Sequence, residues 1–286
     1  KWFKFDIINI GNCSFGHISN ILFKYYFITI MQDIYVDDIG KGFPLVLLHG
    51  FLGSSIMWKP QIEYLKKNYR VIAPDLPGFG KSNNIKACNS IKCMAETILT
   101  SLKKKRIEKF YLLGHSMGGM IAQEIEKISG EQISKLICYS TGPKGNIPGR
   151  FESINETRKK LKNVGLEKTV NRIAKTWFVE EDLAKYFYLC SNAGKTSSIK
   201  AAENALIAMK SWNGIENLKN IKKQTLIIWG DKDKAYNLNQ VMTLNKKIKN
   251  SQLKIFKNCS HNVHLEVPEE FNKCVNDFLK NRNKLY

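Results

Sequence analysis

One pentapeptide, Gly114-His115-Ser116-Met117-Gly118, constrains the fold of this chain more than any other stretch. The apolar run at residues 110–113 predicts a buried strand before it, and residues 117–127 have the spacing of a helix after it. Glycines on either side of the serine suit a sharp strand-to-helix reversal, because side chains there would block the close approach of two backbones. We therefore expect Ser116 at a strained turn, with its hydroxyl above the sheet edge and near the free N–H groups of a helix N-terminus.

Strand and helix patterns alternate on both sides of this turn, which indicates an α/β fold. We expect strands at residues 32–36, 44–48, 70–73, 110–113, 134–139, 225–229 and 252–256. We expect helices at residues 54–67, 90–105, 117–127, 238–248 and 268–280. Because helices separate successive strands, the strands should run mainly parallel, with helices on both faces of the sheet.

The alternation stops between residues 143 and 223, where no strand pattern occurs. Four helical stretches are expected there, at residues 151–163, 166–178, 180–190 and 197–212. An all-helical insertion between two halves of a sheet predicts a cap, with residues 31–142 as the first part of the core and 224–286 as the second. Five large apolar side chains are candidates either to line an acyl pocket or to form the core of the cap: Trp177, Phe178, Tyr186, Met209 and Trp212.

Residues 1–30 differ from the rest of the chain, because they are rich in Phe, Ile and Tyr but follow no clear pattern. We interpret Met31 as the natural start and residues 1–30 as an upstream extension, non-native or disordered, and we exclude it from the fold. The alternative is a degraded secretory signal or an organelle-targeting segment, because this stretch is nearly free of acidic residues.

The formal net charge of +20 suggests a nucleic-acid partner at first, because dense basic surfaces neutralise phosphates. The basic residues are, however, mostly lysines scattered among asparagines and isoleucines, whereas base-reading surfaces favour the fork of arginine. Arginine occurs only at positions 70, 106, 150, 158, 172 and 282. We therefore expect no nucleic acid as a partner.

The seven cysteines are odd in number and include no C-x-x-C pair. This pattern argues against a disulfide framework and against a zinc site, and it favours a reducing, cytoplasmic compartment. No apolar run reaches the length of about 18 residues that a membrane span needs, so we expect none.

Nucleophilic catalysis by a serine requires a base, and a carboxylate that fixes the tautomer of that base. His261 follows the last expected strand and is our candidate base, with His264 as the alternative. Asp233 follows the strand at residues 225–229 and is our candidate carboxylate, with Asp231 as the alternative. The order Ser116, Asp233, His261 is that of an α/β-hydrolase, unlike the orders in chymotrypsin or subtilisin.

Acyl transfer also needs two N–H donors for the negative charge that develops on the carbonyl oxygen. The backbone N–H of Met117, beside the serine, is one candidate. The backbone N–H of Phe51, in the glycine-containing loop after the strand at residues 44–48, is the other. We interpret His49 as a structural support of that loop, and His115 as a packing or orienting neighbour of the site.

Five segments, in this order, resemble the α/β-hydrolase superfamily: His49-Gly50-Phe51-Leu52-Gly53, the stretch 75–82, Gly114-His115-Ser116-Met117-Gly118-Gly119, Trp229-Gly230-Asp231-Lys232-Asp233 and the stretch 260–271. The chain is most similar to the capped small-substrate branch that contains 3-oxoadipate enol-lactonases, carboxylesterases and the biotin-pathway carrier-protein methyl esterase. This resemblance covers about residues 32–280. It implies a mainly parallel, eight-stranded-type sheet with helices on both faces and an inserted helical cap.

The resemblance implies a serine hydrolase without a metal or cofactor, acting on a small ester, lactone or thioester as its acyl substrate. Haloalkane dehalogenases and epoxide hydrolases of this fold carry aspartate in place of Ser116, so those activities are not expected. Carbon–carbon bond hydrolases of ring-cleavage products usually have Asn before the serine and Trp after the histidine, where this chain has His115 and Asn262. Such a hydrolase remains an alternative, as do a ligand-sensing receptor on this fold and an acyltransferase.

Overall fold

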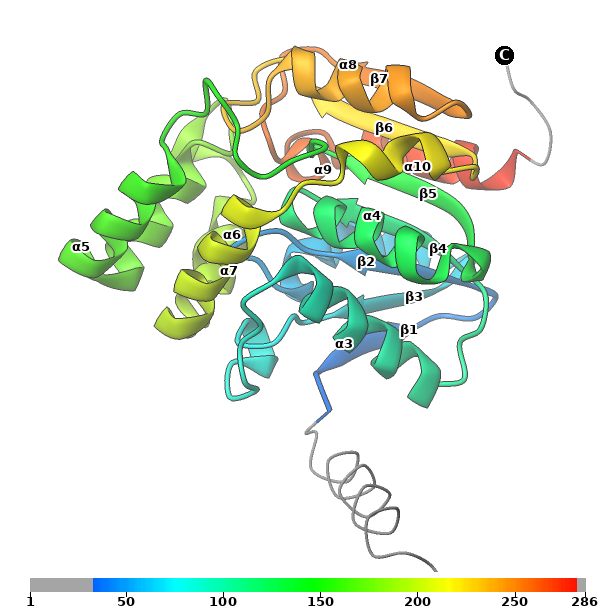
Figure 1. Cartoon of the computed structure of the whole chain (residues 1–286), viewed down its shortest axis with the longest axis horizontal. Helices are drawn as coiled ribbons and strands as arrows, with labels where there is room; N and C mark the ends of the chain where they lie inside the picture. The colour runs from blue at the N-terminus through cyan, green and yellow to red at the C-terminus, as the bar shows by residue number, and fades with distance from the viewer. Residues whose placement is uncertain (1–32, 282–286) are drawn as a thin grey trace, which may run out of the picture. The chain divides into compact units, whose positions relative to one another are not determined.

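A single mainly parallel sheet carries the fold (Figure 1), in a computed structural model that describes residues 33–281. The expected extension at residues 1–30 lies outside the described residues. The strands of this sheet are β1 Val36–Ile39, β2 Phe43–Leu48, β3 Tyr69–Pro74, β4 Phe110–His115, β5 Ile133–Tyr139, β6 Thr225–Gly230 and β7 Ser251–Phe256. Their spatial order is β1-β3-β2-β4-β5-β6-β7, and within the described residues only the β1–β3 pair is antiparallel.

The expected α/β class, with a mainly parallel sheet, is confirmed, although the described residues supply seven strands. The central strands are continuous apolar runs because both of their faces are covered, and every residue of β6 is buried. The expected first strand at residues 32–36 is wrong, since β1 begins at Val36. The backbone carbonyl of Tyr35 instead accepts the N–H of Asp75, and the N–H of Tyr35 donates to the hydroxyl of Ser82. Tyr35 therefore lies in a loop that is held by these two bonds.

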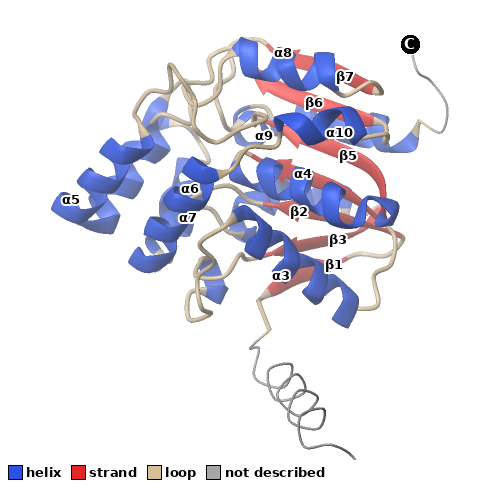
Figure 2. Ribbon diagram, viewed as in Figure 1, coloured by secondary structure: helices blue, strands red, loops and turns tan. Residues whose placement is uncertain are grey.

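Helices cover both faces of the sheet (Figure 2), as expected for parallel strands. Alternate residues of β2 show this, because Val46 and Leu48 belong to one apolar core while Leu45 and Leu47 belong to the other. The first core includes residues of α3, α4 and α8, and the second includes residues of α2 and α10. The bounds are α2 Lys59–Leu65, α3 Ile91–Lys104, α4 Met117–Ser129, α8 Leu238–Lys247 and α10 Pro268–Lys280.

A helical insertion, residues 143–223, separates β5 from β6 and lies beyond the carboxyl ends of the strands (Figure 2). Its α-helices are α5 Ile154–Lys175, α6 Phe187–Lys195 and α7 Ile199–Ser211. Gly165 interrupts α5 with φ 78° and ψ 176°, so the two helices expected at 151–163 and 166–178 follow one another across this kink. The helix expected at 180–190 is displaced, because a short 3-10 turn, Glu181–Leu183, precedes α6.

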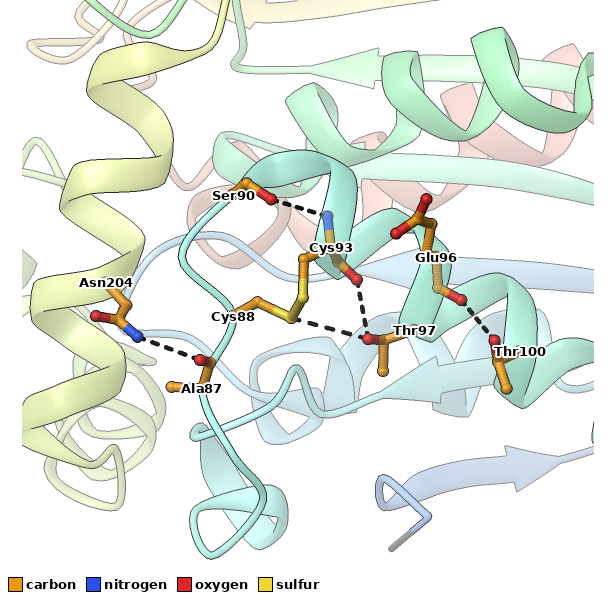
Figure 3. The surroundings of a disulfide bond; sticks show 8 residues. All are labelled: Ala87, Cys88, Ser90, Cys93, Glu96, Thr97, Thr100 and Asn204. Carbon is orange, nitrogen blue, oxygen red and sulfur yellow. Dashed lines mark hydrogen bonds between the residues drawn. A yellow bond between two sulfur atoms is a disulfide. The ribbon is translucent and has the colours of Figure 1, made fainter. Parts of the chain in front are cut away.

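Cys88 and Cys93 form a disulfide at the start of α3 (Figure 3), although the cysteine pattern argues against a disulfide framework. Their Cα atoms are 5.7 Å apart because the chain turns sharply at Ser90, whose hydroxyl caps α3 by accepting the N–H of Cys93. The close approach comes from this turn, which the spacing of the two cysteines does not reveal. No helix in residues 33–281 is long and apolar enough to cross a membrane.

Candidate active site

Ser116 occupies the strained turn that its glycine neighbours predict. Its φ is 56° and its ψ is −118°, between the end of β4 and the start of α4. A Cβ on Gly114 would lie 2.2 Å from the carbonyl oxygen of Gly118, and a Cβ on Gly118 would lie 2.3 Å from that of Leu48. Both glycines are therefore required by close backbone contacts. Ser116 itself is only 8% exposed, so its side chain faces an enclosed cavity and not open solvent.

His261 and Asp233 come together from the loops after β7 and β6. Nδ1 of His261 lies 2.9 Å from Oδ2 of Asp233, and their side chains are 3% and 0% exposed. The other carboxylate oxygen accepts the N–H groups of Ala235, at 2.7 Å, and Tyr236, at 3.1 Å. Three hydrogen bonds thus fix the carboxylate, which holds the His261 ring in one orientation.

The alternative histidine and the alternative aspartate have other partners. Nδ1 of His264 lies 2.9 Å from the hydroxyl of Tyr139, and burial lowers the pKa of His264 to about 3, so its imidazole is neutral. Asp231 accepts the N–H of Asn258 at 2.7 Å, in the turn that follows β7. The carboxylate and the imidazole that meet are therefore those of Asp233 and His261.

Ser116 and His261 line one cavity, together with Gly50, Phe51 and Tyr236. Within the described part of the chain, the hydroxyl of Ser116 and the imidazole of His261 are not joined by a hydrogen bond. In enzymes without substrate, such bonds are often long and tighten only when the reactants are bound. The ring of Tyr236 stacks on His261, with centroids 5.8 Å apart and planes at 11°.

His49 and His115 support the site from behind, as expected. Nδ1 of His49 donates to the carbonyl oxygen of Gly50 at 2.8 Å, while its Nε2 accepts the N–H of Leu76 at 3.0 Å. These two bonds require a neutral ring, and burial lowers the pKa of His49 accordingly. Nε2 of His115 lies 3.2 Å from the carbonyl oxygen of His261, and burial holds the pKa of His115 well below its usual value.

The two backbone amides expected to bind an oxyanion both lie beside Ser116. That of Met117 is next to it in the sequence, and that of Phe51 is close to it in the fold. Phe51 lines the cavity, and the neighbouring Gly50 lies so close that a Cβ there would be 3.0 Å from the Cβ of Ser116. Met117 is the first residue of α4. In the described ranges, neither amide N–H donates a hydrogen bond to another residue, which leaves both available to a ligand.

The helical insertion closes one side of the cavity with Trp177, Met209, Ile147 and Arg150. Of the five apolar side chains considered as lining, Trp177 and Met209 therefore line it. Phe178 is fully buried elsewhere, with its ring centroid 6.2 Å from that of Phe187. Two others do not line this cavity: Trp212, which donates its indole N–H to Glu124 at 3.1 Å, and Tyr186, which packs against the apolar core that contains Val46 and Leu48.

Sequence analysis missed Tyr236 and Arg150 as residues of the cavity. Tyr236 follows Asp233 by three residues. This closeness to the expected carboxylate is the sequence signal that could have identified Tyr236 as a residue of the site. Burial raises the pKa of the Tyr236 phenol to about 12. Arg150 carries no motif, and only the folded loop after β5 brings it to the cavity, where burial lowers the pKa of its guanidinium. Within residues 33–281, no group of three or more His, Cys, Asp or Glu side chains is arranged to hold a metal ion.

Two proteins of similar sequence cover nearly the whole described region. A pimeloyl-[acyl-carrier protein] methyl ester esterase of Legionella pneumophila (strain Corby) is 27% identical over 249 residues, which are 87% of this chain and 100% of that protein. A 2-hydroxy-6-oxononadienedioate/2-hydroxy-6-oxononatrienedioate hydrolase 1 of Pseudomonas putida is 29% identical over 262 residues, covering 86% of this chain and 92% of that protein.

Solved structures are also similar to this chain. An esterase from Exiguobacterium antarcticum superposes with a TM-score of 0.81 and 26% identity, covering 87% of this chain and 96% of that one. An enol-lactonase from Burkholderia xenovorans LB400 has a TM-score of 0.80 with the same coverage, but at 20% identity it supports the fold alone. The family model described as alpha/beta hydrolase fold matches residues 44–268. This chain is therefore a member of the α/β-hydrolase fold family.

Proposed function

We propose that this chain is a serine hydrolase that cleaves a small carboxylic ester, lactone or thioester through an acyl-enzyme. The observation that supports this most directly is the hydrogen bond between Asp233 and His261 at a cavity that Ser116 also lines. In acyl transfer by such a triad, the carboxylate orients the imidazole and stabilises its positive charge. The imidazole is the base, and the hydroxyl is the nucleophile. The esterase names of similar proteins favour the same reaction class.

In the proposed reaction, Oγ of Ser116 attacks the substrate carbonyl carbon while Nε2 of His261 accepts the hydroxyl proton. Asp233, bonded to Nδ1, keeps the imidazole in the required tautomer and stabilises its positive charge. The bond to the leaving group then breaks, and His261 delivers the proton to that group. Water next attacks the acyl-enzyme, gives its proton to His261, and releases the acid as Ser116 regains its proton.

The backbone N–H groups of Phe51 and Met117 bind the oxyanion in this proposal. The strained conformation of Ser116 places its side chain at the start of α4, where free amides and the helix dipole favour negative charge. No cofactor or metal takes part in any step. The helical insertion, residues 143–223, acts as a cap that shapes the acyl pocket through Trp177 and Met209.

Labelling with a fluorophosphonate, combined with turnover of p-nitrophenyl acetate, tests the proposal. Ser116→Ala should abolish labelling and lower kcat by on the order of 10⁶. Ser211→Ala is the matched control, because the Ser211 hydroxyl donates to carbonyl oxygens of its own helix and lies outside the cavity lining. An unchanged rate or unchanged labelling in Ser116→Ala contradicts the proposal.

A carbon–carbon bond hydrolase is the second candidate, because several similar proteins are named as hydrolases of 2-hydroxy-6-oxo-dienoates. The same triad would serve that reaction. Comparing kcat/KM for such a dienoate with kcat/KM for simple esters separates the two candidates. A preference for the dienoate of more than about tenfold would favour the second.

A further inference from the structure

We propose that Arg150 forms a subsite for a carboxylate, so that the natural substrate is an anionic ester, lactone or thioester whose negative charge lies close to the scissile bond. This inference rests on the proposed function, since it names the substrate class of the same site. Arg150 belongs to the helical insertion and lines the cavity together with Ser116 and His261.

The guanidinium of Arg150 forms no ion pair and no side-chain hydrogen bond among residues 33–281. Its Cζ lies 5.3 Å from the ring centroid of Phe151. Arg150 is partly buried, and this burial lowers the pKa of its guanidinium. An arginine that lines the cavity of the nucleophile without an ion pair can offer its guanidinium fork to the carboxylate of a ligand.

The two nearest acidic side chains are already committed to other groups. Glu152 is bound by Arg172, with an Nη1–Oε2 distance of 2.7 Å, and by Lys160. Asp233 is held by His261 and by two backbone N–H groups. Both carboxylates are therefore hydrogen-bonded to groups other than Arg150, which lines the cavity without an ion pair among the described residues.

The anion would bind near the reacting carbon. Tyr236 lines the same cavity as Arg150 and Ser116, so a carboxylate bound by Arg150 would lie in the space that the nucleophile also faces. A carboxylate bound in the fork of Arg150 could also accept the phenolic O–H of Tyr236. Short spacers between carboxylate and scissile carbonyl fit this arrangement.

Two matched pairs of substrates test the subsite, one for each side of the scissile bond. Monomethyl succinate carries the carboxylate on the acyl side, and methyl 4-oxopentanoate is its neutral isostere. Acetoxyacetate carries it on the alcohol side, and acetoxyacetone is its neutral isostere. We expect kcat/KM to favour the anion by about 100-fold or more in at least one pair, because a site built for a polar group rejects its neutral analogue.

Arg150→Gln should remove this preference, bringing the ratio of kcat/KM values within about threefold of one, and Arg150→Lys should restore part of it. Arg158→Gln is the matched control, because it removes the same charge from the same insertion outside the cavity lining. Its ratio should equal that of the unmodified protein.

Hydrolysis of p-nitrophenyl acetate and fluorophosphonate labelling of Ser116 are measured alongside. If both occur but neither anion is preferred by the unmodified protein, or if Arg150→Gln keeps the preference, the carboxylate subsite is wrong while the proposed function stands. If neither occurs, the proposed function itself is wrong, and the subsite inference falls with it. The unmodified protein alone can overturn the inference, so the outcome does not depend on the folding of a variant.

Discussion

Oδ2 of Asp233 lies 2.9 Å from Nδ1 of His261, with both side chains almost completely enclosed. The second oxygen of Asp233 is occupied by two backbone N–H groups, so the carboxylate cannot turn away without breaking buried hydrogen bonds. This relationship directs one nitrogen of His261 to the carboxylate and leaves Nε2 for chemistry in the cavity.

Asp233→Asn should lower kcat for p-nitrophenyl acetate by about 10⁴, because an amide in this position favours the wrong imidazole tautomer. The neighbouring Asp231→Asn is the control, since Asp231 only accepts the N–H of Asn258 and pairs with Lys257. We expect Asp231→Asn to stay within about tenfold of the unmodified rate. Equal losses in the two variants would show that Asp233 has no special role.

Gly118→Ala should destabilise the fold by about 3 kcal/mol, since its Cβ would lie 2.3 Å from the carbonyl oxygen of Leu48, a backbone atom that cannot move aside. Gly130→Ala, with φ −57° and a flexible Glu126 side chain as nearest neighbour, should cost no more than about 0.5 kcal/mol. Urea denaturation of both variants measures these values. If the Gly118→Ala and Gly130→Ala variants were similarly stable, the steric explanation for glycine in the turn at Ser116 would be wrong.

Stability should fall as the pH decreases below about 6.5, the usual pKa of an unfolded histidine. Burial lowers the pKa of His264 to about 3. Between about pH 3 and about pH 6.5, this histidine is therefore neutral in the folded protein but protonated in the unfolded chain. The resulting stabilisation is complete above about pH 6.5 and is lost as the pH falls toward the folded value. For this residue we expect a loss of about 2 kcal/mol between pH 7 and pH 5.

Urea denaturation at these two pH values gives the difference. His264→Gln should show a smaller dependence on pH than the unmodified protein, even if the variant is less stable overall. His49 and His115, whose pKa values burial also lowers, would supply the dependence that remains. An identical pH dependence in the variant would mean that His264 is not held neutral by burial.

Reduction of the Cys88–Cys93 disulfide should lower the melting temperature, because a short closed loop restrains the unfolded chain by about 2 kcal/mol. The double variant Cys88→Ser, Cys93→Ser should melt at the lower temperature with or without reductant. Cys274→Ser should still respond to reductant, because Cys274 is a free thiol. If reductant did not change the melting temperature of the unmodified protein, the Cys88–Cys93 pairing would be contradicted.

Much of the fold follows from local patterns that the sequence displays. The bounds of α10, Pro268–Lys280, agree with expectation because proline marks its first turn. Gly165 marks the break in α5 by adopting φ 78°. The start of β1 was misplaced because a short edge strand has little apolar periodicity, and its pairing with β3 decides where it begins.

The site was less predictable where tertiary contacts create it. Motifs and chain order pointed to Ser116, Asp233 and His261, and the structure brings the last two into direct contact. Arg150 could not be recognised, since it reaches the cavity through a loop whose path depends on the whole fold. The Cys88–Cys93 disulfide was missed for the same reason, because a turn at Ser90 determines their separation.

We expect Ser116 to carry the acyl group during turnover. Acid quenching during hydrolysis of p-nitrophenyl acetate, followed by peptide mass spectrometry, measures this directly. We predict one acetyl group on the peptide that contains Ser116, absent in Ser116→Ala. Full turnover with no acetyl group on Ser116, or with an equal amount of modification in Ser116→Ala, would contradict the account.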